Sequence, residues 1–328
     1  MNWMNKTLAA AVVGFGAALS VAAPAQAEIK IALDSPMDLK NAGTSVWAHH
    51  FAEHLKANGM ATEYFERGAL GGEAEKLDQA SQGLLEVSMS DVKAAGQMDS
   101  TIMAIMLPFF FKDEAHLDRA LREKGMLDRI NAGVTPKGIR VLDIAFVGSA
   151  AGIFNTKKAV TRMSDMSDLR MRALDDVQIA VYKAWGSTGT IVSWGEVPNA
   201  LQTGVADGYL NPPIVPLLFG HTSFIKHFTD AQIIPSSRAV IVSEDWYQGL
   251  SDKERKIVDD AAMKGHAANR EWVKGQGAVI EKLKKAGITV TELSAAERAK
   301  FRAATEPLYG ALPLPDGALD AWKAAAAE

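Results

Sequence analysis

The segment Ile29-Lys30-Ile31-Ala32-Leu33-Asp34-Ser35-Pro36 predicts a half-buried strand that ends in a turn, because apolar and polar side chains alternate up to the turn-prone Asp-Ser-Pro. A helical stripe follows at residues 46–57, a short strand at 63–65, a second helix at about 73–83 and a strand at 87–90. Strands that alternate with helices favour α/β units around a mostly parallel sheet. The sequence therefore predicts an α/β fold.

The same pattern begins again near residue 150. A strand is predicted at residues 138–146, and later strands at 169–172 and 190–192 bracket another helix. Capping boxes at Ser251 to Glu254 and at Ser294 to Glu297 each predict a helix start. The first opens a helix of about 35 residues, to about Ala286, which exceeds the usual roughly 8–20 and favours a strut shared by two lobes.

Length and composition exclude several classes of protein. The 328 residues are enough for about two domains of roughly 100–200 residues each. The formal charge of −4 gives no clustered basic character, so nucleic acid is not expected as a partner. The chain has no cysteine, which excludes disulfides, thiolate nucleophiles and cysteine-built zinc sites.

Residues Met1 to Ala27 have the pattern of a secretory signal peptide. Lys6 supplies the positive end, residues 8–21 are almost wholly apolar or small, and Ala25-Gln26-Ala27 is an A-x-A cleavage site. An uncleaved anchor is the alternative, but the apolar run is short for a membrane span. We expect a mature chain that starts at Glu28, with net charge −4 − 1 = −5, in a bacterial periplasm.

One motif suggests catalysis. His50-x-x-Glu53-His54 matches the inverted zinc-protease pattern H-x-x-E-H, in which two histidines on one helix face bind zinc beside a glutamate base. The alternative is an amphipathic helix that carries histidines, and no third ligand has a supporting pattern. Phosphate-binding loops and nucleophile elbows are absent from the sequence. An exported zinc hydrolase stays the minor alternative; otherwise no enzyme activity, metal or cofactor is predicted.

Three blocks carry a family resemblance. Leu169-Arg170-Met171-Arg172, Ser193-Trp194-Gly195-Glu196-Val197 and residues 200–212, ALQTGVADGYLNP, resemble the substrate-binding proteins of tripartite ATP-independent periplasmic (TRAP) transporters, the DctP-type family. Upstream, Leu70-Gly71-Gly72-Glu73 and Leu107-Pro108-Phe109-Phe110-Phe111 look like that family's L-G-G-E and L-P-F-L-F. The resemblance covers essentially the whole mature chain, and the A-L-Q-T-G block is its most specific part.

The resemblance implies a two-lobed periplasmic binding protein. Lobe I would contain residues 28–149 and about 238–277, and lobe II residues 150–237 and about 278–328. Crossing strands near 148–152 and 236–240 would act as the hinge. Such a protein would act as a monomer, close on a small organic acid and deliver it to the permease subunits. Presentation of the ligand to a sensor kinase is the alternative role.

The resemblance also implies the binding residues. Arg172 matches the family's carboxylate-binding arginine, with a surface ion pair to Asp175 as the alternative. Trp194 stands in place of a phenylalanine that packs on the ligand, with a core tryptophan as the alternative. Asn211 would donate its amide to a ligand oxygen, unless it only forms an Asn-Pro turn. Tyr209 belongs to the same wall, which it makes less acidic than in the family.

Further polar contacts are expected from the first lobe. Glu73 and Asp91 follow its strands, where open α/β sheets bind ligands, although Glu73 is equally suited to a helix N-terminus. Lys93 would be a second cation or the salt-bridge partner of Asp91. Residues 150–160 lack the second arginine that many family members carry, which favours a hydroxy, keto, aromatic or sulfonated monoacid over a simple dicarboxylate.

Overall fold

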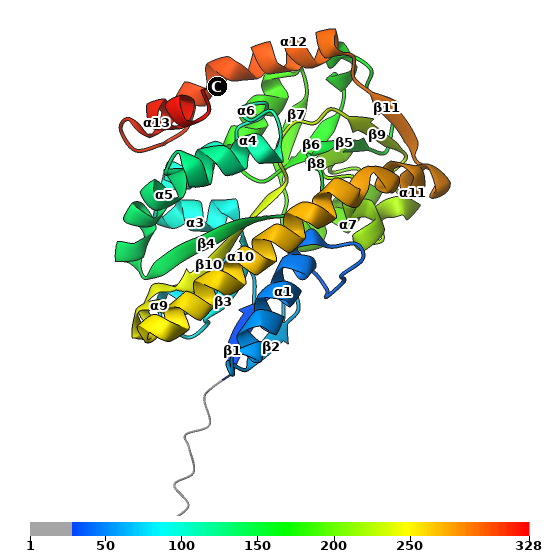
Figure 1. The fold of residues 1–328 in the computed structure, drawn as a ribbon. Coiled ribbons are helices and arrows are strands. Elements are labelled where there is room, and N and C mark those ends of the chain that lie inside the picture. Colours follow the sequence, from blue (N-terminus) through cyan, green and yellow to red (C-terminus); the bar gives the residue numbers. More distant parts are fainter. Residues whose placement is uncertain (1–27, 328) are drawn as a thin grey trace, which may run out of the picture.

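The computed structural model describes residues 28–327, which form two α/β lobes, each built on one sheet (Figure 1). The predicted signal peptide lies outside the described residues. Lobe I contains the sheet β2-β1-β3-β10-β4, and lobe II contains the sheet β11-β9-β5-β8-β6-β7. The strands of lobe I are β1 Ile29–Ala32, β2 Thr62–Phe65, β3 Val87–Asp91, β4 Ile139–Phe146 and β10 Ser237–Ser243. Those of lobe II are β5 Gly152–Asn155, β6 Arg170–Ala173, β7 Thr188–Ile191, β8 Gly208–Asn211, β9 His227–Asp230 and β11 Thr289–Glu292.

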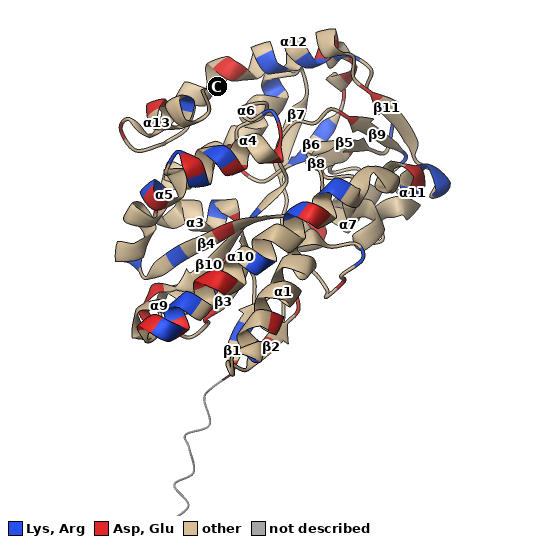
Figure 2. Ribbon diagram, in the orientation of Figure 1, with Lys and Arg blue, Asp and Glu red and all other residues tan. Residues whose placement is uncertain are grey.

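Helices flank both sheets, as the alternating sequence pattern predicts. The α-helices are α1 Gly43–Ala57, α2 Glu73–Ser81, α3 Val92–Met98, α4 Glu114–Asp118, α5 Met126–Val134, α6 Asp176–Ala184, α7 Val197–Gln202, α8 Val215–Leu218, α9 Glu244–Gly249, α10 Asp252–Lys274, α11 Val279–Lys285, α12 Ala295–Thr305 and α13 Ala318–Ala325. No helix among residues 28–327 is long and apolar enough to span a membrane. Acidic and basic residues alternate along α10 instead of gathering by sign (Figure 2).

Both sheets are mixed, whereas the sequence predicts mostly parallel ones. In lobe I, β10 is antiparallel to β3 and β4, and in lobe II, β5 is antiparallel to β8 and β9. β5 and β10 are the strands that the chain enters directly after crossing from one lobe to the other. Each of these two strands therefore runs antiparallel to its neighbours, whereas strands joined by a helix within one lobe run parallel to each other. The two-lobed α/β architecture itself is confirmed.

The chain crosses between the lobes in two adjacent segments. Residues 147–151 connect β4 to β5, and the segment before β10 returns to lobe I. The segments are hydrogen-bonded to each other, because the Val147 amide donates to the Ser236 carbonyl at 2.9 Å and the Ala151 amide donates to the Ile234 carbonyl at 2.8 Å. The crossings lie beside the ranges expected for the hinge. Hinge motion itself remains a prediction.

The predicted long helix spans the expected residues but is interrupted. α10 and α11 are separated by a 3-10 turn at Gly275–Ala278, where two glycines weaken the α-helical ladder. The capping box at Ser251 is confirmed, since the Glu254 amide and carboxylate both bond to Ser251. At α12 only half of the second box forms. Ser294 caps Glu297, whereas the Glu297 carboxylate accepts from the Met163 amide at 3.1 Å.

The C-terminal end of the chain returns to lobe I, which differs from the expected boundary. α12 packs on α6 of lobe II, but α13 packs on α5 and on the 3-10 helix Ser100–Met106 of lobe I. The Trp322 side chain is fully buried in the lobe I core and donates its indole N–H to the Thr101 carbonyl at 2.7 Å. Residues 318–325 therefore belong with lobe I, because burial of this indole needs the lobe I core.

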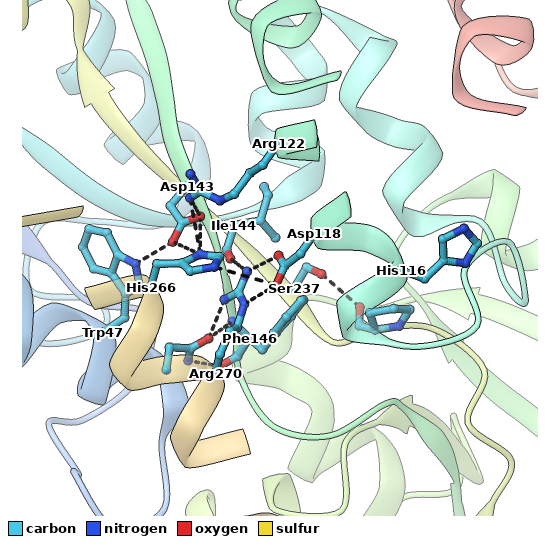
Figure 3. A network of polar contacts seen from close by, with 12 residues as sticks. Trp47, His116, Asp118, Arg122, Asp143, Ile144, Phe146, Ser237, His266 and Arg270 are labelled. Atoms are coloured by element: carbon cyan, nitrogen blue, oxygen red, sulfur yellow. Dashed lines mark hydrogen bonds and ion pairs between the residues drawn. The ribbon is translucent and has the colours of Figure 1, made fainter. Parts of the chain in front are cut away.

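A buried polar network attaches α10 to lobe I (Figure 3). The Asp143 carboxylate on β4 accepts from the Trp47 indole at 2.8 Å, lies 3.1 Å from His266 Nδ1 and pairs with Arg122. Arg270 pairs with Asp118 and lies over the Phe146 ring. The network holds α10 against the end of β4, where the chain leaves the lobe.

Candidate ligand-binding cleft

A cleft of about 580 Å³ lies between the two lobes. Its lobe I wall includes the loop after β1 and the starts of α2 and α3, and its lobe II wall includes the ends of β6, β7 and β8. The crossing segments contribute the residues that join the two walls. The lining residues used below are Asp34, Thr44, Arg67, Glu73, Asp91, Lys93, Arg172, Leu174, Val192, Trp194, Leu210, Asn211 and Arg238. Strand ends gather at the cleft because β1, β3, β6 and β8 point their carboxyl ends toward it.

Arg172 lines the cleft as a buried cation. Its side chain projects from β6 with 7% exposure, and its Nε donates to the Val192 carbonyl at 2.9 Å. It forms no ion pair with any residue in the described range 28–327, and the alternative partner Asp175 instead caps α6 by accepting from the Gln178 amide at 2.9 Å. Burial lowers the pKa of Arg172, an effect that Tyr182 and Asp91 partly offset. An arginine without an acidic partner, held by a carbonyl, leaves its other N–H groups available for an anion.

Position along the strand separates Arg172 from Arg170. The two residues lie two apart on the same face of β6, but Arg170 begins the strand and Arg172 lies nearer the end that borders the cleft. Arg170, two residues earlier on β6, is paired with Asp207 at 3.1 Å and its side chain is half exposed. Arg172 packs beside Tyr182, whose hydroxyl donates to the Arg172 carbonyl at 3.0 Å. β6 is paired in parallel with β7 on one side and β8 on the other, and residues near the ends of all three strands line the cleft.

Trp194 and Asn211 also line the cleft. The Trp194 ring is partly exposed and packs edge-on against Phe219 with 5.2 Å between ring centroids, so it belongs both to the wall and to the margin of the lobe II core. The Asn211 amide nitrogen at the end of β8 is buried and has no hydrogen-bond partner. An Asn-Pro turn alone does not require a buried, unpaired N–H group.

Tyr209 does not reach the cleft, although the sequence places it among the binding residues. Its side chain is fully buried in the lobe II core, with the hydroxyl 3.2 Å from His221 Nδ1. Burial raises the pKa of Tyr209 and lowers the pKa of His221 to about 4. On β8 the last two residues, Leu210 and Asn211, line the cleft, because they lie at the carboxyl end of the strand.

The three expected residues of lobe I line the cleft with partners inside the protein. Asp91 caps α3 by accepting from the Lys93 amide at 3.0 Å and pairs with Arg238 at 3.0 Å. Glu73 accepts from the Asp91 amide at 3.1 Å and lies 3.4 Å from Lys76 Nζ. The Lys93 ammonium reaches across the cleft and donates to the Leu174 carbonyl of lobe II at 2.9 Å.

Sequence reasoning missed Arg238 and Asp34. Arg238 at the start of β10 donates from Nε to Asp34 Oδ2 at 2.9 Å and from Nη1 to Asp91 at 3.0 Å. Burial acts to lower the pKa of Arg238, but Asp91 and Asp34 outweigh it and raise the pKa. Asp34 and Arg238 are 204 residues apart in the sequence, so no local pattern joins them. The sequence does contain one signal, a single arginine directly before the apolar run Ala239-Val240-Ile241-Val242.

The zinc-protease pattern does not assemble a site. His50 and Glu53 are exposed on α1, and Glu53 lies 3.5 Å from Lys56. Within residues 28–327 no group of three or more histidine, aspartate or glutamate side chains is placed to hold a metal ion. The third ligand that the motif requires is therefore not supplied by the described part of the chain, and the hydrolase alternative is not favoured.

Comparisons with known proteins agree with this geometry. Residues 33–312 match the family described as bacterial extracellular solute-binding protein, family 7 (DctP). The chain is 29% identical over 263 residues to the ectoine/5-hydroxyectoine-binding periplasmic protein UehA of Ruegeria pomeroyi, which covers 77% of this chain and 75% of the relative. It is 28% identical over 342 residues to the C4-dicarboxylate-binding periplasmic protein DctP of Rhodobacter capsulatus, covering 99% of this chain and 100% of the relative.

The same agreement holds among solved structures. A TRAP periplasmic solute binding protein from Polaromonas sp. bound to D-erythronate superimposes with a TM-score of 0.82 at 25% identity, covering 92% of this chain and 99% of the other. A second TRAP periplasmic solute binding protein, from Bordetella, gives a TM-score of 0.80 at 25% identity, covering 91% of this chain and 99% of the other.

Proposed function

This chain belongs to the bacterial extracellular solute-binding proteins of family 7, the DctP family of TRAP receptors, and from that membership we propose that Arg172 binds the carboxylate of a small organic acid in its cleft. The members of the family are periplasmic binding proteins. The chain is a solute receptor of this class. The residues that line its cleft determine which acid it binds.

The observation that carries the proposal is the buried guanidinium of Arg172 without an acidic partner. A buried charge is costly unless a counter-charge and hydrogen bonds compensate it. A carboxylate supplies both, because the planar guanidinium can donate two parallel hydrogen bonds to its two oxygens. The unpaired Asn211 amide nitrogen would donate a third hydrogen bond to the same end of the ligand.

The rest of the lobe II wall suits an organic skeleton with a single acid group. Trp194 and Leu210 present apolar surface beside Arg172. In residues 150–160, where the family resemblance leads us to expect a second arginine, the residue that lines the cleft is Ala151. Relatives are named for C4-dicarboxylate and for sialic acid, and a similar structure holds D-erythronate. With one unpaired arginine, we expect this chain to prefer a monocarboxylate.

Ligand binding would be coupled to closure of the lobes. The cleft walls come from different lobes, which are connected by the paired crossing segments at residues 147–151 and 233–236. A ligand that contacts both walls stabilises the closed state only by its extra affinity for that state. The Lys93 to Leu174 hydrogen bond is a direct contact between the lobes, which we expect closure to retain. The closed form would then be recognised by the membrane permease subunits.

Export follows from the same proposal. We expect residues 1–27 to direct secretion and to be cleaved after Ala27, which places the mature receptor in the periplasm. Mass spectrometry of the protein purified from periplasmic extract would then show a chain that starts at Glu28. A chain that retains Met1 to Ala27 would contradict cleavage at this site.

A thermal-shift screen of organic acids, followed by calorimetric titration of each hit, tests the function. An acid present at 100 times its dissociation constant should add about 2.7 kcal/mol to the free energy of unfolding. Arg172→Gln should remove this stabilisation while the chain stays folded. Arg170→Gln on the same strand is the matched control and should retain binding. Wild-type affinity in Arg172→Gln would refute the assignment.

A further inference from the structure

Buried polar atoms without partners are concentrated in the cleft. Among residues 28–327, seven buried side-chain nitrogen or oxygen atoms lack a hydrogen-bond partner, and three of them belong to cleft residues: Asp34 Oδ1, Thr44 Oγ1 and Asn211 Nδ2. Such atoms are rare in folded proteins, because each loses its bonds to water without replacement. Asn211 belongs to the lobe II wall, whereas Asp34 and Thr44 belong to lobe I, where the expected contacts Glu73, Asp91 and Lys93 already have partners within the protein.

Asp34 is held rigidly with one oxygen free. The side chain is 4% exposed, and its Oδ2 accepts from Arg238 Nε at 2.9 Å. The Asp34 carbonyl is also fixed, since it accepts from Arg67 Nη1 at 2.8 Å. An ionised carboxylate can only accept hydrogen bonds, so the free Oδ1 requires a donor. Neither a second carboxylate nor an alkyl group can supply one.

Thr44 places a second unpaired polar atom on the same wall. It lies in the first turn of α1, its side chain is fully buried, and its Oγ1 has no partner. A hydroxyl can donate and accept, so Oγ1 can complement a ligand hydroxyl or accept from an ammonium group. Lobe I therefore offers hydrogen-bond acceptors to the same cleft in which lobe II offers a cation and an amide donor.

We propose that the ligand is a monocarboxylate bearing a hydroxyl or ammonium group that donates to Asp34 Oδ1, with Thr44 as its second contact. The inference rests on the proposed function, because Arg172 is assumed to hold the acid end. Lobe II recognises the acid, and lobe I recognises the donor. A dicarboxylate would bring a like charge to Asp34, and a plain alkanoate would leave Oδ1 unpaired.

A matched series of acids tests this specificity by calorimetry. Butyrate, γ-hydroxybutyrate, γ-aminobutyrate and succinate share one carbon chain and differ only in the terminal group, and longer homologues extend the same comparison. A hydrogen bond to a charged acceptor predicts that the best donor-bearing acid binds about 10- to 100-fold tighter than its alkanoate and dicarboxylate. The hydroxyl and ammonium arms show which donor the cleft accepts.

Asp34→Ala should abolish this preference. Alanine offers neither a donor nor an acceptor, and Arg238 keeps its ion pair with Asp91, so the alkanoate and the hydroxy acid should bind within about 3-fold of each other. Thr44→Val removes only the hydroxyl and should reduce the same ratio. Asp143→Asn is the control, because that aspartate is equally buried and paired with arginine but lies outside the cleft, and it should leave the ratio unchanged.

The outcomes separate this inference from the function itself. Acids that bind through Arg172 without any preference for a donor group, or a preference that survives both Asp34→Ala and Thr44→Val, overturn the inference alone. No binding of any acid in the series, or binding that Arg172→Gln leaves intact, overturns the proposed function and this inference with it.

Discussion

The guanidinium carbon of Arg172 lies 5.7 Å from the centroid of the Trp194 ring, and the same short segment supplies the Val192 carbonyl that accepts from Arg172 Nε. The segment after β7 therefore orients the arginine twice, by a hydrogen bond and by an aromatic face. Trp194 is supported in turn by Phe219 and His221, whose rings lie 5.2 and 5.3 Å from its own. The binding arginine is thus positioned by packing that reaches into the lobe II core.

Trp194→Ala should weaken ligand binding without unfolding the protein. Loss of a cation–π contact and of apolar wall surface should cost about 1–3 kcal/mol, or roughly 5- to 100-fold in the dissociation constant. Trp194→Phe keeps an aromatic face and should lose less. Calorimetry with an acid from the screen measures both. Trp246→Ala on α9, away from the cleft, is the control, and equal affinity in Trp194→Ala and the control would contradict this role.

Tyr209→Phe should leave ligand affinity unchanged, because the hydroxyl contacts His221 inside lobe II and does not reach the cleft. The loss of one buried hydrogen bond should lower the free energy of unfolding by about 1 kcal/mol. Chemical denaturation and ligand titration measure the two effects separately. A loss of affinity of ten-fold or more would show that Tyr209 touches the ligand after all.

Stability should fall as the pH decreases from about 6.5 toward 4. Burial lowers the pKa of His221 from 6.5 to about 4, so the unfolded chain binds this proton at a higher pH than the folded chain does. The contribution of neutral His221 is complete above about pH 6.5 and is lost as the pH falls through about 4. His221→Gln can still accept from Tyr209 and should flatten the midpoint of thermal unfolding across this range. A variant with the same pH profile as the wild type would exclude His221 as the cause.

Asp143→Asn should destabilise lobe I and change its response to acid. Burial acts to raise the pKa of Asp143, but His266, Arg270 and Arg122 outweigh it and lower the pKa to about 2. The folded pKa lies below the unfolded value, so this contribution is present above about pH 4 and is lost as the pH falls toward 2. Removing one partner of a buried ion-pair network should cost about 3 kcal/mol near neutral pH. Urea titrations at neutral and acidic pH should show a smaller difference between variant and wild type in acid, and a constant difference would contradict the shift.

Local patterns were sufficient to predict the elements that build the cleft. A strand was predicted at residues 169–172, and the structure forms β6 there with Arg172 toward the end that borders the cleft. The Ser251 cap fixed the start of α10 because its hydrogen bonds are made within four residues. These features depend on neighbours in the sequence, which is why the sequence alone reveals them.

Features that depend on distant partners were not predictable. Asp34 belongs to the cleft through its pairing with Arg238, and α13 joins lobe I because Trp322 is buried in that core. Tyr209 was assigned to the cleft wall but is buried in the lobe II core, since a resemblance in sequence does not give the surroundings of a side chain. The reciprocal bond of the second capping box was lost to Met163, a competing donor from another part of lobe II.

A crystal structure of the complex with the tightest-binding acid from the screen tests the central claim most directly. The account predicts a carboxylate within hydrogen-bonding distance of both the Arg172 guanidinium and the Asn211 amide, between lobes that enclose it. An acid bound with its carboxylate on any other cation, and with Arg172 facing no ligand oxygen, would contradict the account.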